Sequence, residues 1–172
     1  MRFPAVIRRL ACCLLPLCVA CGSEPVPDRK DCALTIKMTG AVERDLDGPQ
    51  ACSLIASSEP NPPTFTSYVE LGESYHLSIT LADLTEGATG QFVADLGVLQ
   101  QPGPSAWGNP LGSCTVQLSD HSVFDKNHGD AWLYRLTGSG SCTQPATGLN
   151  ADSPGSIEFS DFSFKTLVGW KQ

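Results

Sequence analysis

The stretch YHLSITLA, Tyr75–Ala82, decides the fold class that this sequence predicts. Apolar side chains occupy every second position from Tyr75 to Leu81, and His, Ser and Thr fill the positions between them. A period of two places the apolar residues on one face of an extended chain and the polar residues on the other. The stretch therefore predicts a β-strand with one buried face.

The same alternation recurs along the chain. It is found in ALTIKMTG, Ala33–Gly40; CTVQLS, Cys114–Ser119; WLYRLTGSG, Trp132–Gly140; and GSIEFSDFSFKTLV, Gly155–Val168. In the last of these stretches the apolar positions slip by one residue. A slip of this kind predicts a β-bulge, which we place near Ser160–Asp161.

Turn-forming residues separate the predicted strands, and the chain holds sixteen glycines and thirteen prolines. The stretch GQFVADLGVLQ, Gly90–Gln100, fits either a short helix or a strand, and we favour a strand. Several short strands separated by turns are typical of an antiparallel β-sandwich. We therefore predict an all-β fold, a sandwich with a small barrel as the alternative, formed by one domain over residues 32–172.

The N-terminus has a different character. Arg2, Arg8 and Arg9 precede an apolar run of eleven residues, Leu10–Ala20. A transmembrane helix needs about twenty apolar residues. A basic start, a run of this length and a small residue at its end are typical of a secretory signal peptide, which we assign to residues 1–20.

The end of this run, LCVAC at Leu17–Cys21, resembles the lipobox of bacterial lipoprotein precursors. The resemblance implies that the sulfur of Cys21 receives a diacylglyceryl group and that cleavage occurs just before it. The new amino group is then acylated as well, with a fatty acid such as palmitate. The sequence departs from the family pattern at Cys18, where the family prefers Leu. Gly22, rather than Asp, implies sorting to the outer membrane.

Two other interpretations of this segment remain. Ordinary secretion would cut the same bond without adding lipid, and Cys18 with Cys21 could form a metal-binding pair. No second pair of ligands follows at zinc-site spacing, which disfavours the metal. A lipid anchor of two or more chains would hold the protein stably on a membrane.

Residues 22–31, GSEPVPDRKD, predict an extended tether between the anchor and the domain. The chain from Cys21 onward has eight Lys and Arg against eighteen Asp and Glu, a net charge of −10. Such a surface repels phosphate backbones, so we expect no nucleic-acid partner. The expected partners are the membrane, through the lipid, and an envelope protein or glycan.

Five cysteines follow the predicted cleavage site, and an odd thiol is a liability in an oxidising compartment. Lipidation of Cys21 would leave an even number. Four cysteines allow three pairings. We predict the disulfides Cys32–Cys52 and Cys114–Cys142, because each pair begins and ends a predicted hairpin.

The sequence has no catalytic motif that we can identify, and we expect neither enzymatic activity nor a cofactor besides the lipid. The one suggestive cluster is SDHSVFDKNHGD, Ser119–Asp130. Its His121, Asp125, His128 and Asp130 are weak candidates for metal ligands. A polar hairpin turn at NHG, between strands that end at Phe124 and begin at Ala131, is the simpler interpretation.

Trp107 is the candidate ligand-binding residue, because it lies in a loop rich in Pro and Gly, PSAWGNP. An exposed ring there could stack on a sugar or anchor a partner. Capping one end of the core is its simpler role. Our leading hypothesis is a non-catalytic binding or structural domain of the bacterial cell envelope. A carbohydrate-binding module that uses Trp107 is the alternative, followed by a hydrolase or metal-dependent enzyme.

Overall fold

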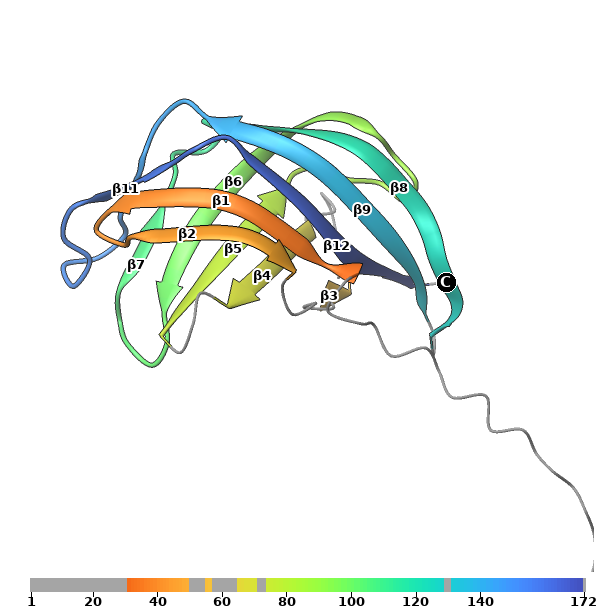
Figure 1. The fold of residues 1–172 in the computed structure, drawn as a ribbon, viewed down its shortest axis with the longest axis horizontal. Helices are drawn as coiled ribbons and strands as arrows, with labels where there is room; N and C mark the ends of the chain where they lie inside the picture. The colour runs from red at the N-terminus through yellow and green to blue at the C-terminus, as the bar shows by residue number, and fades with distance from the viewer. Residues whose placement is uncertain (1–30, 50–54, 57–64, 71–73, 129–130, 172) are drawn as a thin grey trace, which may run out of the picture.

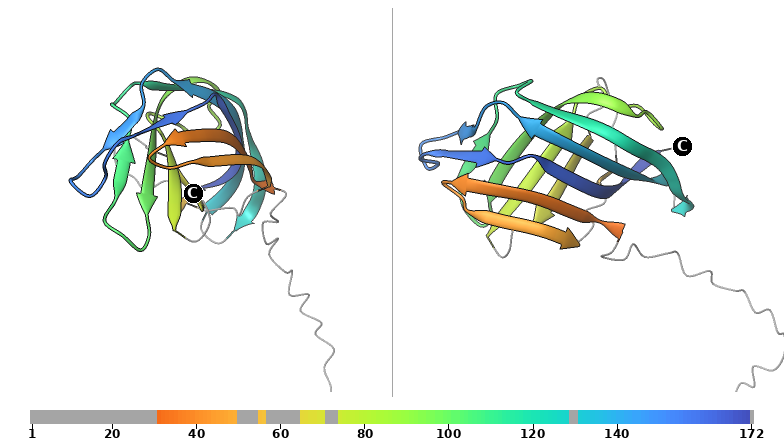
Figure 2. Two further views of the ribbon diagram at one scale, coloured as in Figure 1. Left: turned by 60° about the vertical axis from the view of Figure 1, so that its left-hand side comes forward. Right: turned by 45° about the horizontal axis from the view of Figure 1, so that its top comes forward.

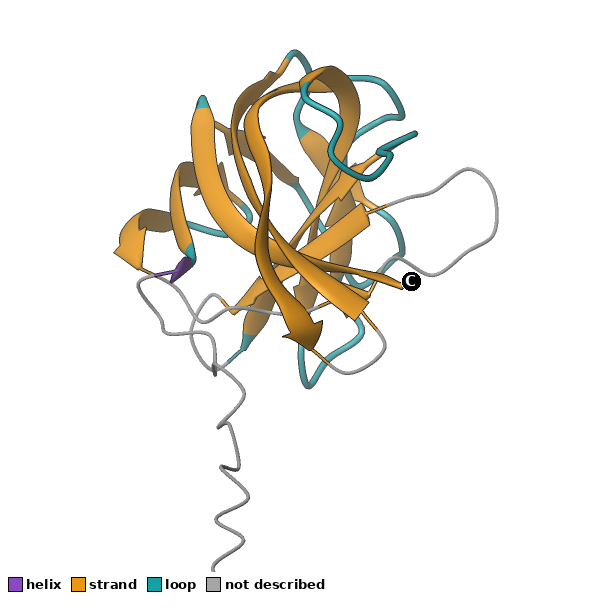
Figure 3. Cartoon of the chain, turned by 90° about the vertical axis from the view of Figure 1, so that its right-hand side faces the viewer, coloured by secondary structure: helices purple, strands orange, loops and turns teal. Residues whose placement is uncertain are grey.

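The computed structural model describes residues 31–49, 55–56, 65–70, 74–128 and 131–171 (Figure 1). These residues form twelve strands: β1 (Ala33–Gly40), β2 (Arg44–Pro49), β3 (Ile55–Ala56), β4 (Phe65–Glu70), β5 (Tyr75–Leu81), β6 (Gly90–Gln100), β7 (Ala106–Gly108), β8 (Cys114–His128), β9 (Ala131–Cys142), β10 (Ala146–Gly148), β11 (Ser156–Phe159) and β12 (Phe162–Lys171). The all-β prediction is confirmed (Figure 3), and Gly90–Gln100 is the strand β6 (Figure 1). Within the described ranges, no helix has the length and apolar character needed to cross a membrane.

All twelve strands belong to one sheet. Every pairing between described strands is antiparallel except that of β3 with β12. The sheet begins with β4–β5–β6 and ends with β1–β2. Between β6 and β1 it divides into two branches, β8–β9–β12 and β7–β10–β11.

Three long strands of this sheet are each interrupted once, and each branch contains one half of every interrupted strand. β7 leads into β8, β9 into β10 and β11 into β12, so both halves occupy the same place in the strand order. Hydrogen bonds continue across the breaks: Asn109 N donates to Leu96 O at 3.1 Å, Thr143 N to Ser113 O at 2.8 Å, and Ser160 N to Lys37 O at 2.9 Å. We call this line of interruptions, residues 109–113, 143–145 and 160–161, the seam.

The predicted bulge forms one part of the seam. Met38 of β1 lies opposite Phe159, whereas Thr35 lies opposite Ser163. Two residues separate the positions on β1 and three separate those on the other strand, so β11–β12 carries one extra residue. The bulge at Ser160–Asp161 is therefore confirmed. It shifts the chain by one residue, so the apolar residues of β11 before the bulge and those of β12 after it face the same, inner side of the sheet.

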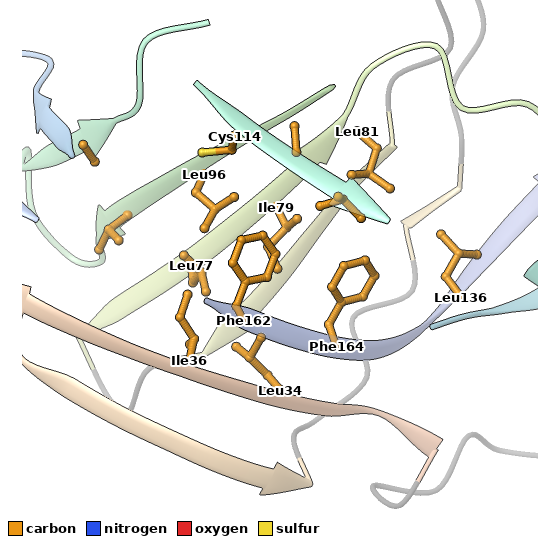
Figure 4. Close-up of a cluster of buried hydrophobic side chains, with 14 of the residues drawn as sticks. Leu34, Ile36, Leu77, Ile79, Leu81, Leu96, Cys114, Leu136, Phe162 and Phe164 are labelled. Atoms are coloured by element: carbon orange, nitrogen blue, oxygen red, sulfur yellow. The ribbon is translucent and has the colours of Figure 1, made fainter. Parts of the chain in front are cut away.

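The sheet bends around one hydrophobic core. Strands β4, β5 and β6 lie behind β1, β9 and β12 and cross them at an angle (Figure 2). Leu77 and Ile79 of β5 point toward Phe162 and Phe164 of β12, and all four are at most 6% exposed (Figure 4). Alternation within each strand supplies these inward-facing side chains.

Two glycines of β9 make room for the phenyl rings. Gly140 lies opposite Phe162 and Gly138 lies opposite Phe164. A Cβ on Gly140 would lie 2.6 Å from Cζ of Phe162, and one on Gly138 would lie 3.0 Å from Cζ of Phe164. This part of β9 is paired on both sides, with β8 and with β12.

The predicted disulfide Cys114–Cys142 is present. It joins the first residue of β8 to the last residue of β9, directly opposite each other at the seam. Cys32 is disulfide-bonded as well, at the start of the domain. Its predicted partner, Cys52, lies outside the described residues, so this pairing stays a prediction.

The hairpin of β8 and β9 is longer than the sequence suggested. β8 does not end at Phe124 but continues to His128, which lies opposite Ala131. Register shifts on β8 between Val123 and Asp125, and again before His128, absorb the extra residues. The polar segment is therefore mostly strand, because bulges let it pair despite its irregular pattern.

The phenyl packing predicts that Gly140→Ala destabilises the domain. The new Cβ would lie 2.5 Å from the backbone oxygen of Thr115, as well as against Phe162. We expect a loss of about 1–3 kcal/mol in the free energy of unfolding, measured by urea denaturation. Gly108→Ala is the matched control, because its Cβ would lie 3.4 Å from the nearest atom, which belongs to the exposed side chain of Leu149. Equal stability of the two variants would contradict the tight packing.

Candidate functional sites

A row of polar side chains crosses the outer face of the sheet. Thr35 lies opposite Ser163, Ser163 opposite Ser139, Ser139 opposite Gln117, and Gln117 opposite Gln91. These residues come from β1, β12, β9, β8 and β6, and all five are exposed. We call them the polar row. Alternation turns their neighbours inward, so the outer face is left with hydroxyl and amide groups.

A depression of about 500 Å³ lies over one end of the polar row. Gln91, Gln117 and Ser139 line it, together with neighbouring residues of β8 and β9 and of the seam next to β12, namely Thr115, Val116, Gly140, Ser141, Asp161 and Phe162. Ser and Gly side chains are short, which leaves the surface hollow between the longer glutamines. The lining offers hydrogen-bond donors and acceptors and a single carboxylate, that of Asp161.

A second group of interacting residues is centred on a histidine inside the fold. His121 of β8 is only 6% exposed and lies between Tyr134 of β9 and Trp170 of β12. Its Nδ1 is 3.0 Å from the carbonyl oxygen of Ala88, and Trp170 Nε1 donates to its Nε2 at 3.0 Å. The hydroxyl of Tyr134 donates to Glu86 Oε1. We call these five residues the histidine cluster.

Burial and hydrogen bonding disfavour the charged forms of His121 and Tyr134. Burial lowers the pKa of His121 most strongly, against smaller raising effects of its Ala88 hydrogen bond and of the nearby Asp120 and Glu86 carboxylates. The hydrogen bond to Glu86 raises the pKa of Tyr134 to about 12. Tyr134 therefore stays a neutral donor, and the lone pair of His121 accepts the indole hydrogen of Trp170.

The metal candidates do not assemble into a site among the described residues. In these ranges no three His, Cys, Asp or Glu side chains gather closely enough to hold a metal ion. His121 points inward, and its lone pair accepts the indole hydrogen of Trp170. Asp125 and His128 lie on β8, opposite Leu133 and Ala131. Asp130 lies outside the described residues.

Trp107 is part of the core, which corrects the hypothesis of an exposed aromatic platform. It lies in the short strand β7, and only 4% of its surface is exposed. Its indole nitrogen donates to the carbonyl oxygen of Pro154 at 3.4 Å. Ser153 Oγ accepts from the backbone nitrogen of Ala106 at 2.7 Å and so holds the adjacent loop in place. The ring therefore caps the core and has no free face for a sugar.

Sequence reasoning found neither the polar row nor the histidine cluster. Alternation identifies outward residues such as Ser139, but not which residues lie beside them on other strands. His121 turns inward because the register of β8 shifts between Leu118 and Asp120, one residue ahead of it. The change of phase in CTVQLSDHSV was the available signal, since apolar positions stop alternating after Leu118.

Trp107→Ala should therefore destabilise the domain strongly. Removal of a buried indole leaves a cavity, and we expect a loss of about 3–5 kcal/mol in the free energy of unfolding, measured by thermal or urea denaturation. Leu111→Ala is the control, because Leu111 is 89% exposed and should leave stability nearly unchanged. Unchanged stability of the Trp107 variant would restore the exposed-platform hypothesis.

Comparison with known proteins adds no family to these observations. No protein-family model matches the chain, and no curated protein or solved structure matches it. The sites above are therefore described from the residues of this chain alone.

Proposed function

We propose that this protein is a lipid-anchored lipoprotein of the bacterial cell envelope. Cleavage before Cys21 and acylation of its sulfur would leave residues 22–31 as a tether and residues 32–172 as the domain. The motif LCVAC and the cysteine count support this proposal. Cys114 and Cys142 are bonded to each other and Cys32 is bonded as well, which fits a chain that matures in an oxidising compartment.

The proposed location is the outer membrane, with the domain facing the periplasm or the outside. Gly22 supports this sorting through the lipoprotein resemblance. The tether of ten residues would allow the domain to stand at most ~35 Å from the anchored cysteine. The domain would therefore work close to the membrane surface.

For the domain itself we propose a β-sandwich arrangement rather than a small barrel. Two observations support it: the layers cross at an angle on either side of the core (Figure 2), and the seam bends three strands at neighbouring positions. A sheet folded over in this way gives two layers joined along the bend.

We propose that the domain acts by binding rather than by catalysis, through the outer face that carries the polar row. The depression over Gln91, Gln117 and Ser139 is the observation that carries this proposal. Its hydroxyl and amide groups can form many hydrogen bonds and supply no obvious nucleophile with a neighbouring base. The two groups with shifted pKa, His121 and Tyr134, bond to other parts of the protein.

A more specific candidate function is carbohydrate binding at this depression. Neutral sugars present hydroxyl groups, which pair with amide and hydroxyl side chains in both directions. The depression has one carboxylate and offers no exposed aromatic ring, so binding would depend on hydrogen bonds more than on stacking. This differs from the module expected at Trp107, which is buried.

The anchor can be tested with Cys21→Ser. We expect this variant to leave the membrane fraction, because no sulfur remains to be acylated. Cys18→Ser is the matched control and should remain bound. The intact mass of the wild-type protein should equal Cys21–Gln172 plus acyl groups minus four hydrogens, one pair for each disulfide. A Cys21→Ser protein that stays in the membrane, or a mature mass without lipid, would refute the lipoprotein proposal.

The binding face can be tested with the double variant Gln117→Ala/Ser141→Ala. Removal of two hydrogen-bonding groups should weaken binding of a neutral polysaccharide about tenfold, measured by affinity electrophoresis against a panel of glycans. Thr147→Ala on β10 is the control, because it is exposed and lies outside the depression. Equal affinity of both variants, or no binding by the wild-type domain, would rule out carbohydrate binding at this site.

A further inference from the structure

The histidine cluster connects three parts of the chain that are distant in sequence. Ala88 belongs to the loop of residues 82–89 between β5 and β6, His121 to β8, and Trp170 to the C-terminal end of β12. One imidazole ring bonds to both others, with Nδ1 and Nε2 each 3.0 Å from a partner atom. The loop and the end of β12 are therefore tied together through a single titratable side chain.

The partners of the ring determine its tautomer. The carbonyl oxygen of Ala88 can only accept, so Nδ1 must carry a hydrogen. The indole nitrogen of Trp170 can only donate, so Nε2 must present its lone pair. Both bonds exist together only in the neutral Nδ1–H form of His121.

We propose that His121 is an acid-sensitive latch between loop 82–89 and the C-terminal end of β12. A proton taken up at Nε2 converts the acceptor into a donor that faces the indole N–H of Trp170. The two N–H groups cannot bond to each other, so the link from His121 to Trp170 is lost. The bond from Nδ1 to Ala88 can persist, so the direct link from the loop to Trp170 is lost while the Tyr134–Glu86 bond still joins the loop to β9.

The groups that face His121 bear on how readily this happens. From β8, Asp120 is nearby, and from the loop, Glu86 is nearby; both are negatively charged and favour the imidazolium. From β9, Tyr134 presents its ring edge with centroids 5.3 Å apart and keeps its hydroxyl on Glu86. Trp170 of β12 carries no charge. Burial opposes the charged form and is the largest effect, so the pKa of His121 is lowered.

The sign of the pH dependence follows from this direction. In the unfolded chain His121 takes up a proton near its ordinary pKa of 6.5, whereas the folded protein does so only at lower pH. The unfolded state thus binds more protons between these two values. The stability that the neutral latch contributes is complete above the unfolded pKa and decreases as the pH falls through 6.5 toward the lowered folded pKa.

The latch can be tested without any change to His121. The chain has three histidines, so the variant His76→Gln/His128→Gln leaves His121 as its only one. In this variant, ¹⁵N NMR at about pH 7.5 should show a neutral ring with a protonated Nδ1. As the pH is lowered through the titration of the ring, which the same spectra follow, hydrogen exchange of the Trp170 indole should accelerate about tenfold beyond its intrinsic pH dependence.

Two results would overturn the proposal: an Nε2–H tautomer or imidazolium at neutral pH, or exchange at Trp170 that does not follow titration of His121. Trp170→Phe provides a second measurement, because it removes the donor and frees Nε2. His121 should then titrate at a higher pH than in the parent variant. An unchanged titration would show that the Trp170 bond does not hold the ring neutral.

Discussion

Hydrogen bonding that continues through three interrupted strands is the constraint on which the rest of the structure depends. At the seam each strand breaks and changes direction, yet bonds such as Thr143 N to Ser113 O keep neighbouring strands in register. The bend brings β5 and β6 over β12 and so encloses the core. The disulfide Cys114–Cys142 spans the same line, where two strand ends meet without a long ladder beyond them. Constraint of the unfolded chain by such a bridge contributes about 3 kcal/mol in the chain-entropy model.

The bend gives the two faces of the sheet different roles. On the inner face, large side chains such as Phe162 fill the angle between the layers, and Gly140 supplies the space for its ring. On the outer face, the outward-facing residues of β8, β9 and β12 are polar and several of them are short, so a depression remains over part of this surface. Glycine and serine thus alternate along β9 for separate reasons: the glycines admit the phenyl rings inside, and the serines leave room outside. The close packing and the depression come from the same stretch, Gly138–Cys142.

The features of this fold that can be predicted from the sequence are those that depend on the residues of a single strand. Period-two alternation identified the strands, and a slip in it located the bulge at Ser160–Asp161, because both are local patterns. The pairing of strands depends on register, and register depends on bulges that leave weak marks in a polar segment. His121 was therefore named only as a weak candidate for a metal ligand, although it lies inside the fold. The sequence left Trp107 between a binding role and a core role for a related reason: the groups that enclose it, such as Pro154, are distant in sequence.

The two candidate sites differ in the kind of function that each can serve. A ligand must compete with whatever a side chain already bonds to, and the ring nitrogens of His121 already bond to Ala88 and Trp170. Any external chemistry there would first have to break the fold locally, which suits a residue that responds to acid rather than one that meets a substrate. The polar row has the opposite character, because residues such as Gln91 and Ser139 are exposed on well-paired strands. A rigid surface of this kind binds without rearrangement, since its strands are already held in place on both sides. The proposed binding is therefore better placed on the outer face, and the proposed response to acid in the histidine cluster.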